Sequence, residues 1–203
     1  MLLTLHPDNP NPRDLKKVIE VLNKDGVIIL PTDTIYAMAC KLESKKAIER
    51  MSKLSGKRIE KVNYSLLCAD LSSISDYTSH IDKNVFRLLK ASLPGAFTFI
   101  LNANNQVGKY FGGNKKTIGI RVPDNVIAQT LIKELGQPLV VTTIHHEDEI
   151  IEYMTDPEEI HDKFEHQVDM VIDGGAGGNI PSTIIDCTSD EIEVIREGKG
   201  ILP

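Results

Sequence analysis

Long apolar runs, paired cysteines and an excess of basic residues are all missing from this chain of 203 residues. No apolar stretch approaches the roughly 20 residues that a membrane-spanning helix needs. The apolar start at residues 1–5 is also too short for the core of a signal peptide. We therefore expect a cytoplasmic protein with no membrane partner.

Metal and disulfide patterns are equally absent. Cys40, Cys68 and Cys187 show no CxxC spacing, and each lies in or beside an apolar run, which favours buried free thiols. Two histidines and three acidic residues follow one another at 145–149, but adjacent side chains rarely point at one ion, so a solvated loop is favoured. We assign no metal ligand. Nothing resembles a Ser-His-Asp triad or a nucleophile elbow, so we assign no catalytic nucleophile either.

A net charge of -6 argues against strong nonspecific binding to a nucleic-acid backbone, because that binding scales with the phosphates that Lys and Arg neutralise. A local basic patch stays compatible with it. Lys53, Lys57 and Arg58 form such a patch, although a run of this kind is normally a solvated face.

Apolar periodicity predicts one α/β domain over residues 1–203, because 41% hydrophobic content can bury one sizeable core. Strands interleave with helices and some strands follow one another directly, which predicts a mixed sheet with helices packed on it. The expected helices are 13–25, 44–53, 84–91, 125–135 and 157–164. The expected strands are 27–30, 64–68, 97–101, 117–122, 139–142, 170–172, 183–186 and 192–195, and 53–62 is expected to be a polar loop.

Hydroxyls and arginines stand where apolar runs stop. The segments are 31–36 (PTDTIY), 117–123 (TIGIRVP), 181–183 (PST) and 196–198 (REG). Strand ends of an α/β sheet are where ligands usually bind. Several small donors and two fixed cations indicate an anionic ligand.

Each segment also has a structural alternative. The residues after Pro31 form either a ligand-binding turn or a turn capped by its own Asp and Thr side chains. Arg121 either holds a carboxylate or phosphate by two hydrogen bonds or pairs with a nearby carboxylate of the chain. The glycine-rich stretch 174–178 before Ser182 can let backbone amides approach a ligand, but no Gly-Lys-Ser follows, so it is not a P-loop.

Together with 63–68 (NYSLLC) and 93–101 (LPGAFTFIL), these segments resemble the YrdC/YciO family of threonylcarbamoyl-AMP synthase-like proteins, and its YciO branch more than the synthases. The match runs from about residue 18 to 200. It implies a YrdC/RibB-like domain, a twisted mixed sheet with flanking helices and a concave binding face. It also implies synthesis of threonylcarbamoyl-adenylate from L-threonine, bicarbonate and ATP, with Mg²⁺ bridging phosphate oxygens, as the precursor of a modified adenosine in tRNA.

The resemblance also supplies the expected binding residues. They bind substrate or nucleotide in the implied site: Thr32, Thr34, Tyr36, Lys53, Lys57, Arg58, Arg121, Thr143, Ser182 and Arg196. No covalent nucleophile is needed, because the carbamate of threonine attacks the α-phosphate, so the task of the site is positioning and charge neutralisation.

Two departures from the synthases predict weak or redirected activity. Their Lys-x-Arg pair is displaced or broken here, since Lys53 is followed by Leu54 and Ser55, and Lys57 and Arg58 come later. Where they carry Ser-Thr-Ser-Ala-Asn, this chain reads VTTIH at 141–145. Thr143 can replace a serine hydroxyl, whereas His145 does not reproduce an amide's simultaneous donor and acceptor.

Two rival functions therefore stay open. One is an RNA- or ribosome-associated binding protein without efficient synthase activity, which the altered signature favours and the net charge opposes. The other is nucleotide-dependent acyl or carbamoyl chemistry on another small amine or carboxylate.

Overall fold

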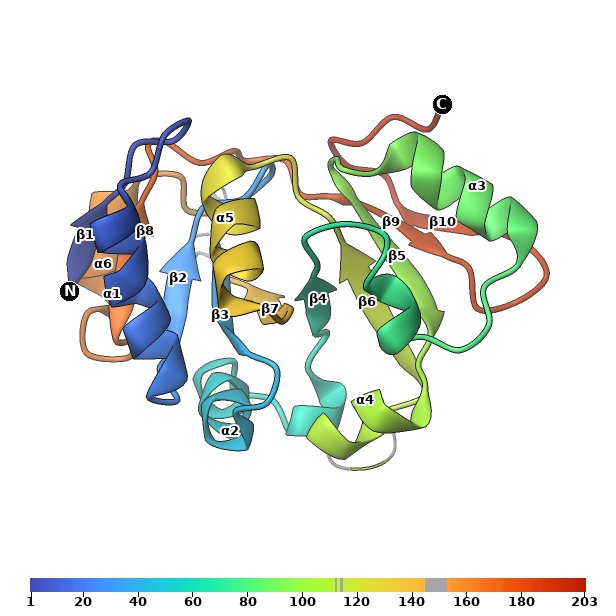
Figure 1. Ribbon diagram of the computed structural model, residues 1–203, viewed down its shortest axis with the longest axis horizontal. Helices are drawn as coiled ribbons and strands as arrows, with labels where there is room; N and C mark the ends of the chain where they lie inside the picture. Colours follow the sequence, from blue (N-terminus) through green and yellow to red (C-terminus); the bar gives the residue numbers. More distant parts are fainter. Residues whose placement is uncertain (112, 114, 145–152) are drawn as a thin grey trace.

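The fold of this computed structural model is described for residues 1–111, 113, 115–144 and 153–203 (Figure 1). Its centre is one ten-stranded sheet with the order β1-β8-β2-β3-β7-β4-β6-β5-β9-β10. The strands are β1 (Leu2–Thr4), β2 (Ile28–Leu30), β3 (Ala37–Lys41), β4 (Ser65–Leu67), β5 (Phe97–Asn102), β6 (Thr117–Arg121), β7 (Leu139–Thr143), β8 (Met170–Asp173), β9 (Thr183–Asp186) and β10 (Glu193–Arg196).

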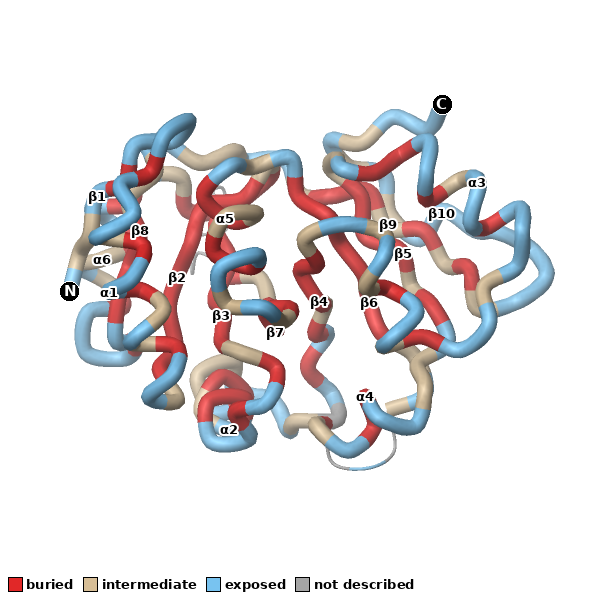
Figure 2. Tube along the Cα trace, in the orientation of Figure 1, coloured by how far each residue is buried: buried red, intermediate tan, exposed pale blue. Residues whose placement is uncertain are grey.

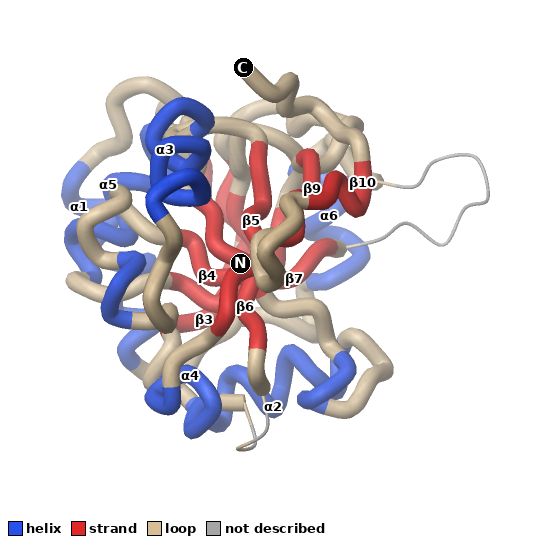
Figure 3. Tube along the Cα trace, turned by 90° about the vertical axis from the view of Figure 1, so that its right-hand side faces the viewer, coloured by secondary structure: helices blue, strands red, loops and turns tan. Residues whose placement is uncertain are grey.

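Six α-helices and two 3-10 helices of the described residues surround this sheet, and Figure 3 shows the strands at the centre of the molecule. The helices are α1 (Pro12–Asn23), α2 (Lys45–Leu54), α3 (Lys83–Ser92), α4 (Asn105–Tyr110), α5 (Val126–Leu135), α6 (Pro157–Phe164), η1 (Ile59–Lys61) and η2 (Ile74–Asp76). Each α-helix begins after a side chain that accepts a backbone N–H, as Asn11 does before α1 and Asp156 before α6.

The sheet is mixed, as the sequence predicts. β8 pairs in parallel with β1 and β2, β4 with β6, and β5 with β9, whereas the remaining neighbours are antiparallel. The twisted mixed α/β fold is therefore confirmed.

Two apolar clusters hold the layers together. In one, α1 and α5 pack on the sheet through residues such as Leu22 and Leu131. The other buries Met51 of α2, Leu89 of α3 and Ile160 of α6 with strand residues. Figure 2 shows the buried residues following the strands and the inner helix faces, whereas the outer helix faces are exposed.

Two strands (β1 and β3), the helix α4 and both 3-10 helices go beyond the sequence prediction. β1 has only three residues, and α4 is a short, polar helix that contains Gly108. β3 lacks β-branched side chains, and it forms because it pairs on both sides, with β2 and β7. The expected loop 53–62 instead contains the end of α2 and the 3-10 turn η1.

The predicted free, buried thiols are confirmed. Cys40, Cys68 and Cys187 are unpaired and buried. Burial raises the pKa of the Cys68 thiol to about 12 and raises that of Cys187 to about 11, so both stay protonated near neutral pH. Within the described part of the chain, no helix has the length and apolar character needed to cross a membrane.

Candidate functional site

A cleft of about 480 Å³ opens where the ends of several strands meet the loop after α2 and the end of α6. The residues that line it come from all of these elements: Ile35, Ala37, Met38, Leu54, Ser55, Lys57, Val62, Asn63, Ser65, Thr98, Arg121, Val141, Thr142, Thr143, Ile144, Lys163, Phe164, Gln167, Ser182, Ile184 and Arg196. The cleft therefore gathers five predicted binding residues: Lys57, Arg121, Thr143, Ser182 and Arg196.

Arg121 lies at the end of β6 and is almost fully buried. Its Nη2 donates to Asp33 Oδ1 at 2.8 Å and to Thr34 Oγ1 at 2.9 Å, and the side chains of Arg121 and Asp33 are 7% and 6% exposed. The structural alternative for Arg121, a pair with a carboxylate of the chain, is thus present. Arg121 lines the cleft, whereas Asp33 is not among the lining residues and lies behind Arg121 as its partner.

The turn between β2 and β3 uses its own hydroxyls to hold this arginine. Thr32 Oγ1 donates to the carbonyl of Ile35 at 2.7 Å and accepts the Thr34 amide at 3.1 Å. The two hydroxyls are 3.1 Å apart, so the Thr34 hydroxyl donates to Thr32 and accepts from Arg121. Thr32 and Thr34 are therefore engaged inside the turn, as in its structural alternative, and their contact with a ligand stays a prediction.

Opposing influences act on the Arg121 guanidinium. Burial lowers its pKa, the adjacent Asp33 carboxylate raises it, and the positive charge of Arg196 lowers it. Two like charges are thus held near one another at the cleft. A bound anion would relieve this repulsion.

Ser182 and Arg196 line the cleft together with Thr98. The Ser182 hydroxyl lies 2.7 Å from Thr98 Oγ1, and Arg196 Nη2 donates to the Ser182 carbonyl at 2.8 Å. Thr183 is not among the lining residues, and its hydroxyl donates to Gly200 O at 2.6 Å. The hydrogen bonds of Arg196 to described residues go to the neutral Ser182 carbonyl and not to a carboxylate.

A β-bulge in β10 sets the direction of Arg196. Val194 lies opposite Ile185 and Arg196 lies opposite Ile184, so Ile195 is an extra residue. In a regular strand, Arg196 would share the face of Val194, two residues before it. The bulge instead places Arg196 beside Ile184, which lines the cleft.

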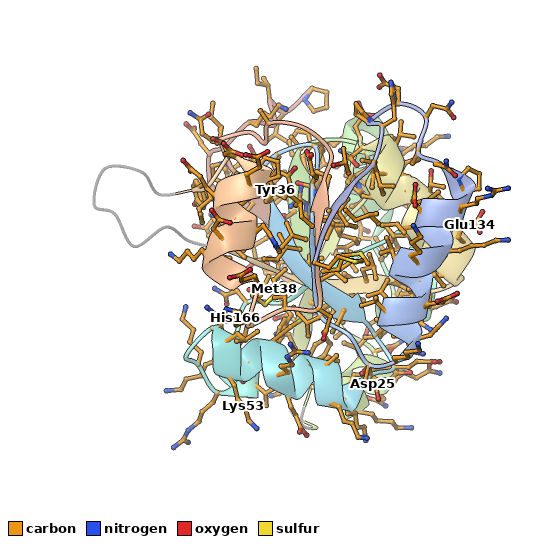
Figure 4. All side chains as sticks on the ribbon, turned by 90° about the vertical axis from the view of Figure 1, so that its left-hand side faces the viewer. Asp25, Tyr36, Met38, Lys53, Glu134 and His166 are labelled. Atoms are coloured by element: carbon orange, nitrogen blue, oxygen red, sulfur yellow. The ribbon has the colours of Figure 1, made fainter. Side chains whose placement is uncertain are left out.

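The three basic residues predicted in the loop after α2 separate in the structure. Lys57 lines the cleft, whereas Lys53 and Arg58 are exposed and do not. Figure 4 shows Lys53 on the side of α2 that faces away from Tyr36 and Met38. Ser52 fixes the turn, because its hydroxyl donates to Lys57 O at 2.6 Å. Lys57 is therefore the best placed of the three for a cleft ligand.

Tyr36 is buried and binds the glycine-rich stretch. Its hydroxyl donates to Gly175 O at 2.7 Å and accepts the Gly174 amide at 3.2 Å. Burial is the main cause that raises the Tyr36 pKa to about 12. Tyr36 is not among the lining residues of the cleft. Its observed hydrogen bonds link it to the glycine-rich stretch, and a contact with a ligand stays a prediction.

We expect Gly177→Ala to lower the free energy of unfolding by about 1–3 kcal/mol, because a Cβ there would lie 2.6 Å from the Tyr36 ring. Urea unfolding followed by circular dichroism measures this loss. Ala176→Gly serves as the control, because it changes the neighbouring residue and adds no atoms beside the ring. Gly56→Ala is less suitable, because the positive φ of Gly56 would itself strain an alanine. A Gly177→Ala protein as stable as the wild type would contradict the tight packing.

The altered nucleotide signature is only partly described. Thr143 is half-buried at the end of β7, opposite Ala37, and lines the cleft. His145, the residue expected to change the nucleotide pocket, lies outside the described residues, as does the 145–149 run.

Sequence reasoning missed several residues of the cleft. Thr98 and Ser65 stand on β5 and β4 inside stretches that served only to identify the family. Lys163 comes from the last turn of α6, and Gln167 from the segment that follows this helix. The hydroxyls had a usable signal, because each interrupts a strand of apolar residues. The α6 residues had none, since the fold alone brings that helix to the cleft.

The charged residues that line the cleft, among those described, are all basic. They are Lys57, Arg121, Lys163 and Arg196, and the described lining residues include no Asp, Glu, His or Cys. Mg²⁺ prefers oxygen ligands such as carboxylates, and the described chain has no cluster of three metal-ligating side chains. Magnesium brought in by ligand phosphates stays a prediction.

Comparison with known proteins identifies the fold and the family. A family model described as "Telomere recombination" (Sua5_yciO_yrdC) matches residues 20–198. The chain is 44% identical to the uncharacterized protein YciO of Escherichia coli (strain K12) over 198 residues, which are 97% of this chain and 94% of that protein. The crystal structure of E. coli YciO matches with a TM-score of 0.88 at 41% identity, covering 99% of this chain and 97% of that one.

More distant relatives include proteins with a named activity or ligand. The threonylcarbamoyl-AMP synthase of Vibrio vulnificus (strain YJ016) is 25% identical over 188 residues, 91% of this chain and 98% of that protein. The crystal structure of P. abyssi Sua5 complexed with L-threonine shares the fold, with a TM-score of 0.87 at 19% identity, and covers 98% of this chain and 57% of that one. The predicted resemblance is confirmed, and the chain belongs to the Sua5/YciO/YrdC family.

Proposed function

We propose that the cleft binds ATP or a related nucleotide together with a small carboxylate such as L-threonine, and that the protein carries out threonylcarbamoyl-AMP synthase-type chemistry. The observation that carries this proposal is the set of four basic residues, with no acidic one, among the described cleft residues of a chain whose net charge is -6. The relation to a synthase at 25% identity and the threonine bound to the Sua5 fold neighbour support the choice of ligands.

The proposed reaction needs no covalent enzyme intermediate. The amine of threonine captures bicarbonate with loss of water, and an oxygen of the resulting carbamate attacks the α-phosphate of ATP. The bond from the α-phosphate to the β-phosphate breaks, and pyrophosphate leaves. The product, threonylcarbamoyl-adenylate, would serve modification of adenosine in tRNA.

The residues of the cleft have separate tasks in this proposal. Arg121 meets the carboxylate of threonine, while Arg196 and Lys57 neutralise phosphate oxygens. The hydroxyls of Ser182 and Thr98 also line the cleft, and because one donates to the other, the second can donate to an oxygen that gains charge. Binding and orientation therefore supply most of the rate.

We expect synthase activity below that of the synthases, or activity on another small amine or carboxylate. Lys53 lies away from the cleft, so only Lys57 remains from the displaced basic pair to contact the triphosphate. Each missing charge-assisted contact costs about 1.5–3 kcal/mol. Full-rate formation of threonylcarbamoyl-adenylate by the purified protein would contradict this expectation.

A pyrophosphate-release assay with ATP, L-threonine and bicarbonate tests the proposed function. Lys57→Ala should lower the release rate about 10- to 100-fold, because it removes a charge-assisted contact to phosphate. Arg58→Ala is the matched control: it removes the neighbouring positive charge, which does not line the cleft, and should retain most of the activity. Equal losses in both variants would indicate a general charge effect, and no release above background from the wild type would refute the synthase chemistry.

RNA binding is the second candidate, and one observation favours it. Lys53, Lys57, Arg58 and Lys61 are all exposed on the segment from the end of α2 to η1, and Lys57 of this group lines the cleft. Such a group can contact phosphates even on an acidic protein. Filter binding of tRNA at several salt concentrations tests it: RNA binding predicts an affinity that falls with salt and is weakened by Lys61→Ala, which does not line the cleft.

A further inference from the structure

The three nitrogens of the Arg121 guanidinium differ in how many hydrogen bonds they donate. Both Nη2 hydrogens are engaged, one by Asp33 and one by Thr34. Nε and Asp33 Oδ2 are buried and have no partner. Nη1 has no hydrogen bond to a described residue, and Arg121 lines the cleft, so Nη1 is the nitrogen that is left to donate to a cleft ligand.

This geometry limits what Arg121 can do for a ligand. A carboxylate is held most strongly by two parallel N–H donors, but Nη2 has none to spare while Asp33 and Thr34 stay in place. The negative charge of Asp33, 2.8 Å from Nη2, also offsets the positive charge that the ligand meets. Arg196 differs, because its recorded bonds go to the neutral carbonyl of Ser182.

The position of Asp33 is fixed by its surroundings. Lys199 Nζ donates to the Asp33 carbonyl at 2.6 Å, and Thr32 bonds to Thr34 and Ile35 on the far side of the turn. A Cβ on Gly178 would collide with the Thr34 carbonyl, so the glycine-rich stretch lies directly against this turn. Asp33 is therefore held beside Arg121 from several directions.

We propose that Asp33 is a specificity-determining residue: it occupies one of the two carboxylate positions of Arg121, so that a lone carboxylate binds weakly and a ligand with a second anionic group near Arg196 is favoured. This inference rests on the proposed anion-binding role of the cleft. It explains why a buried carboxylate stands at the edge of a cleft that is otherwise lined by basic and neutral side chains. Arg121 then orients the ligand carboxylate, and Arg196 with Lys57 supplies most of the attraction.

The test compares two simple anions, acetate and inorganic phosphate, titrated into the full-length protein while the side-chain resonances of the arginines are followed by NMR. In Asp33→Asn, the amide oxygen can still accept from Nη2, but the competing charge is gone. We expect acetate to bind about tenfold more tightly than to the wild type and the ratio of the acetate Kd to the phosphate Kd to fall about tenfold. Asp124→Asn, which removes an exposed carboxylate three residues from Arg121, should leave both values unchanged.

A second variant covers the case in which Asp33→Asn does not fold. Thr34→Val keeps the charge of Asp33 but frees one Nη2 hydrogen, and acetate should bind about threefold more tightly. Unchanged or weaker acetate binding in the folded variant, with an unchanged ratio of the two Kd values, would overturn the inference and leave Asp33 a purely structural partner. These titrations use neither ATP nor threonine. A wild type that binds neither ATP nor threonine would therefore refute the proposed function, while the acetate and phosphate titrations would still test the role of Asp33.

Discussion

Replacing Arg121 with methionine is expected to lower the free energy of unfolding by about 3–5 kcal/mol. The change leaves the Asp33 carboxylate, 6% exposed, without the guanidinium that balances its charge. It also leaves the Thr34 hydroxyl without its donor. Urea unfolding of the wild type and the variant, followed by circular dichroism, measures the difference.

The matched control removes both charges at once. Asp33→Asn combined with Arg121→Met should lie within about 1 kcal/mol of the wild type, because replacing a buried ion pair by neutral groups is often close to neutral. A single Arg121→Met variant as stable as the wild type would show that the Asp33–Arg121 pair does not support the fold.

Replacing Arg196 with alanine should affect ligand binding far more than stability. Arg196 is partly exposed and bonds to the Ser182 carbonyl, which water can reach once the guanidinium is gone. A charge-assisted contact of about 1.5–3 kcal/mol corresponds to a fall in ATP affinity of about 10- to 150-fold. Isothermal titration with ATP measures the fall, and the unfolding midpoint shows that the fold is kept.

Arg87→Ala is the control for this variant, since Arg87 is an exposed arginine on α3 that does not line the cleft. Its ATP affinity should equal that of the wild type. If Arg196→Ala also kept the wild-type affinity, Arg196 would be reduced to a structural contact of β9 and β10.

The sequence predicts most of this fold because its longer elements carry their own signal. The helix Pro12–Asn23 has apolar residues at helical spacing and a cap, and strands such as Thr183–Asp186 appear as apolar runs bounded by polar residues. β3 escapes prediction, because its Ala, Met and Cys side chains have no strong strand preference and only its two neighbours make it a strand. Elements that depend on distant pairing leave little mark on a local pattern.

The sequence predicts several of the residues that belong to the candidate site, but not which contacts they make there. Arg121, Ser182 and Arg196 stand out, because charged and hydroxyl groups at strand ends are unusual beside apolar runs, and the structure does place all three in one cleft. The pairing of Arg121 with Asp33 spans 88 positions, and the bulge that directs Arg196 is a property of strand register. Neither can be derived from local periodicity.

Isothermal titration of the wild type with ATP and L-threonine, separately and together, tests the central claim most directly. We expect measurable ATP binding through Arg196 and Lys57, weak threonine binding alone, and tighter threonine binding once ATP is present. Absence of heat for ATP, for threonine and for the mixture, in a protein shown to be folded, would contradict the claim that this cleft is a nucleotide and carboxylate site.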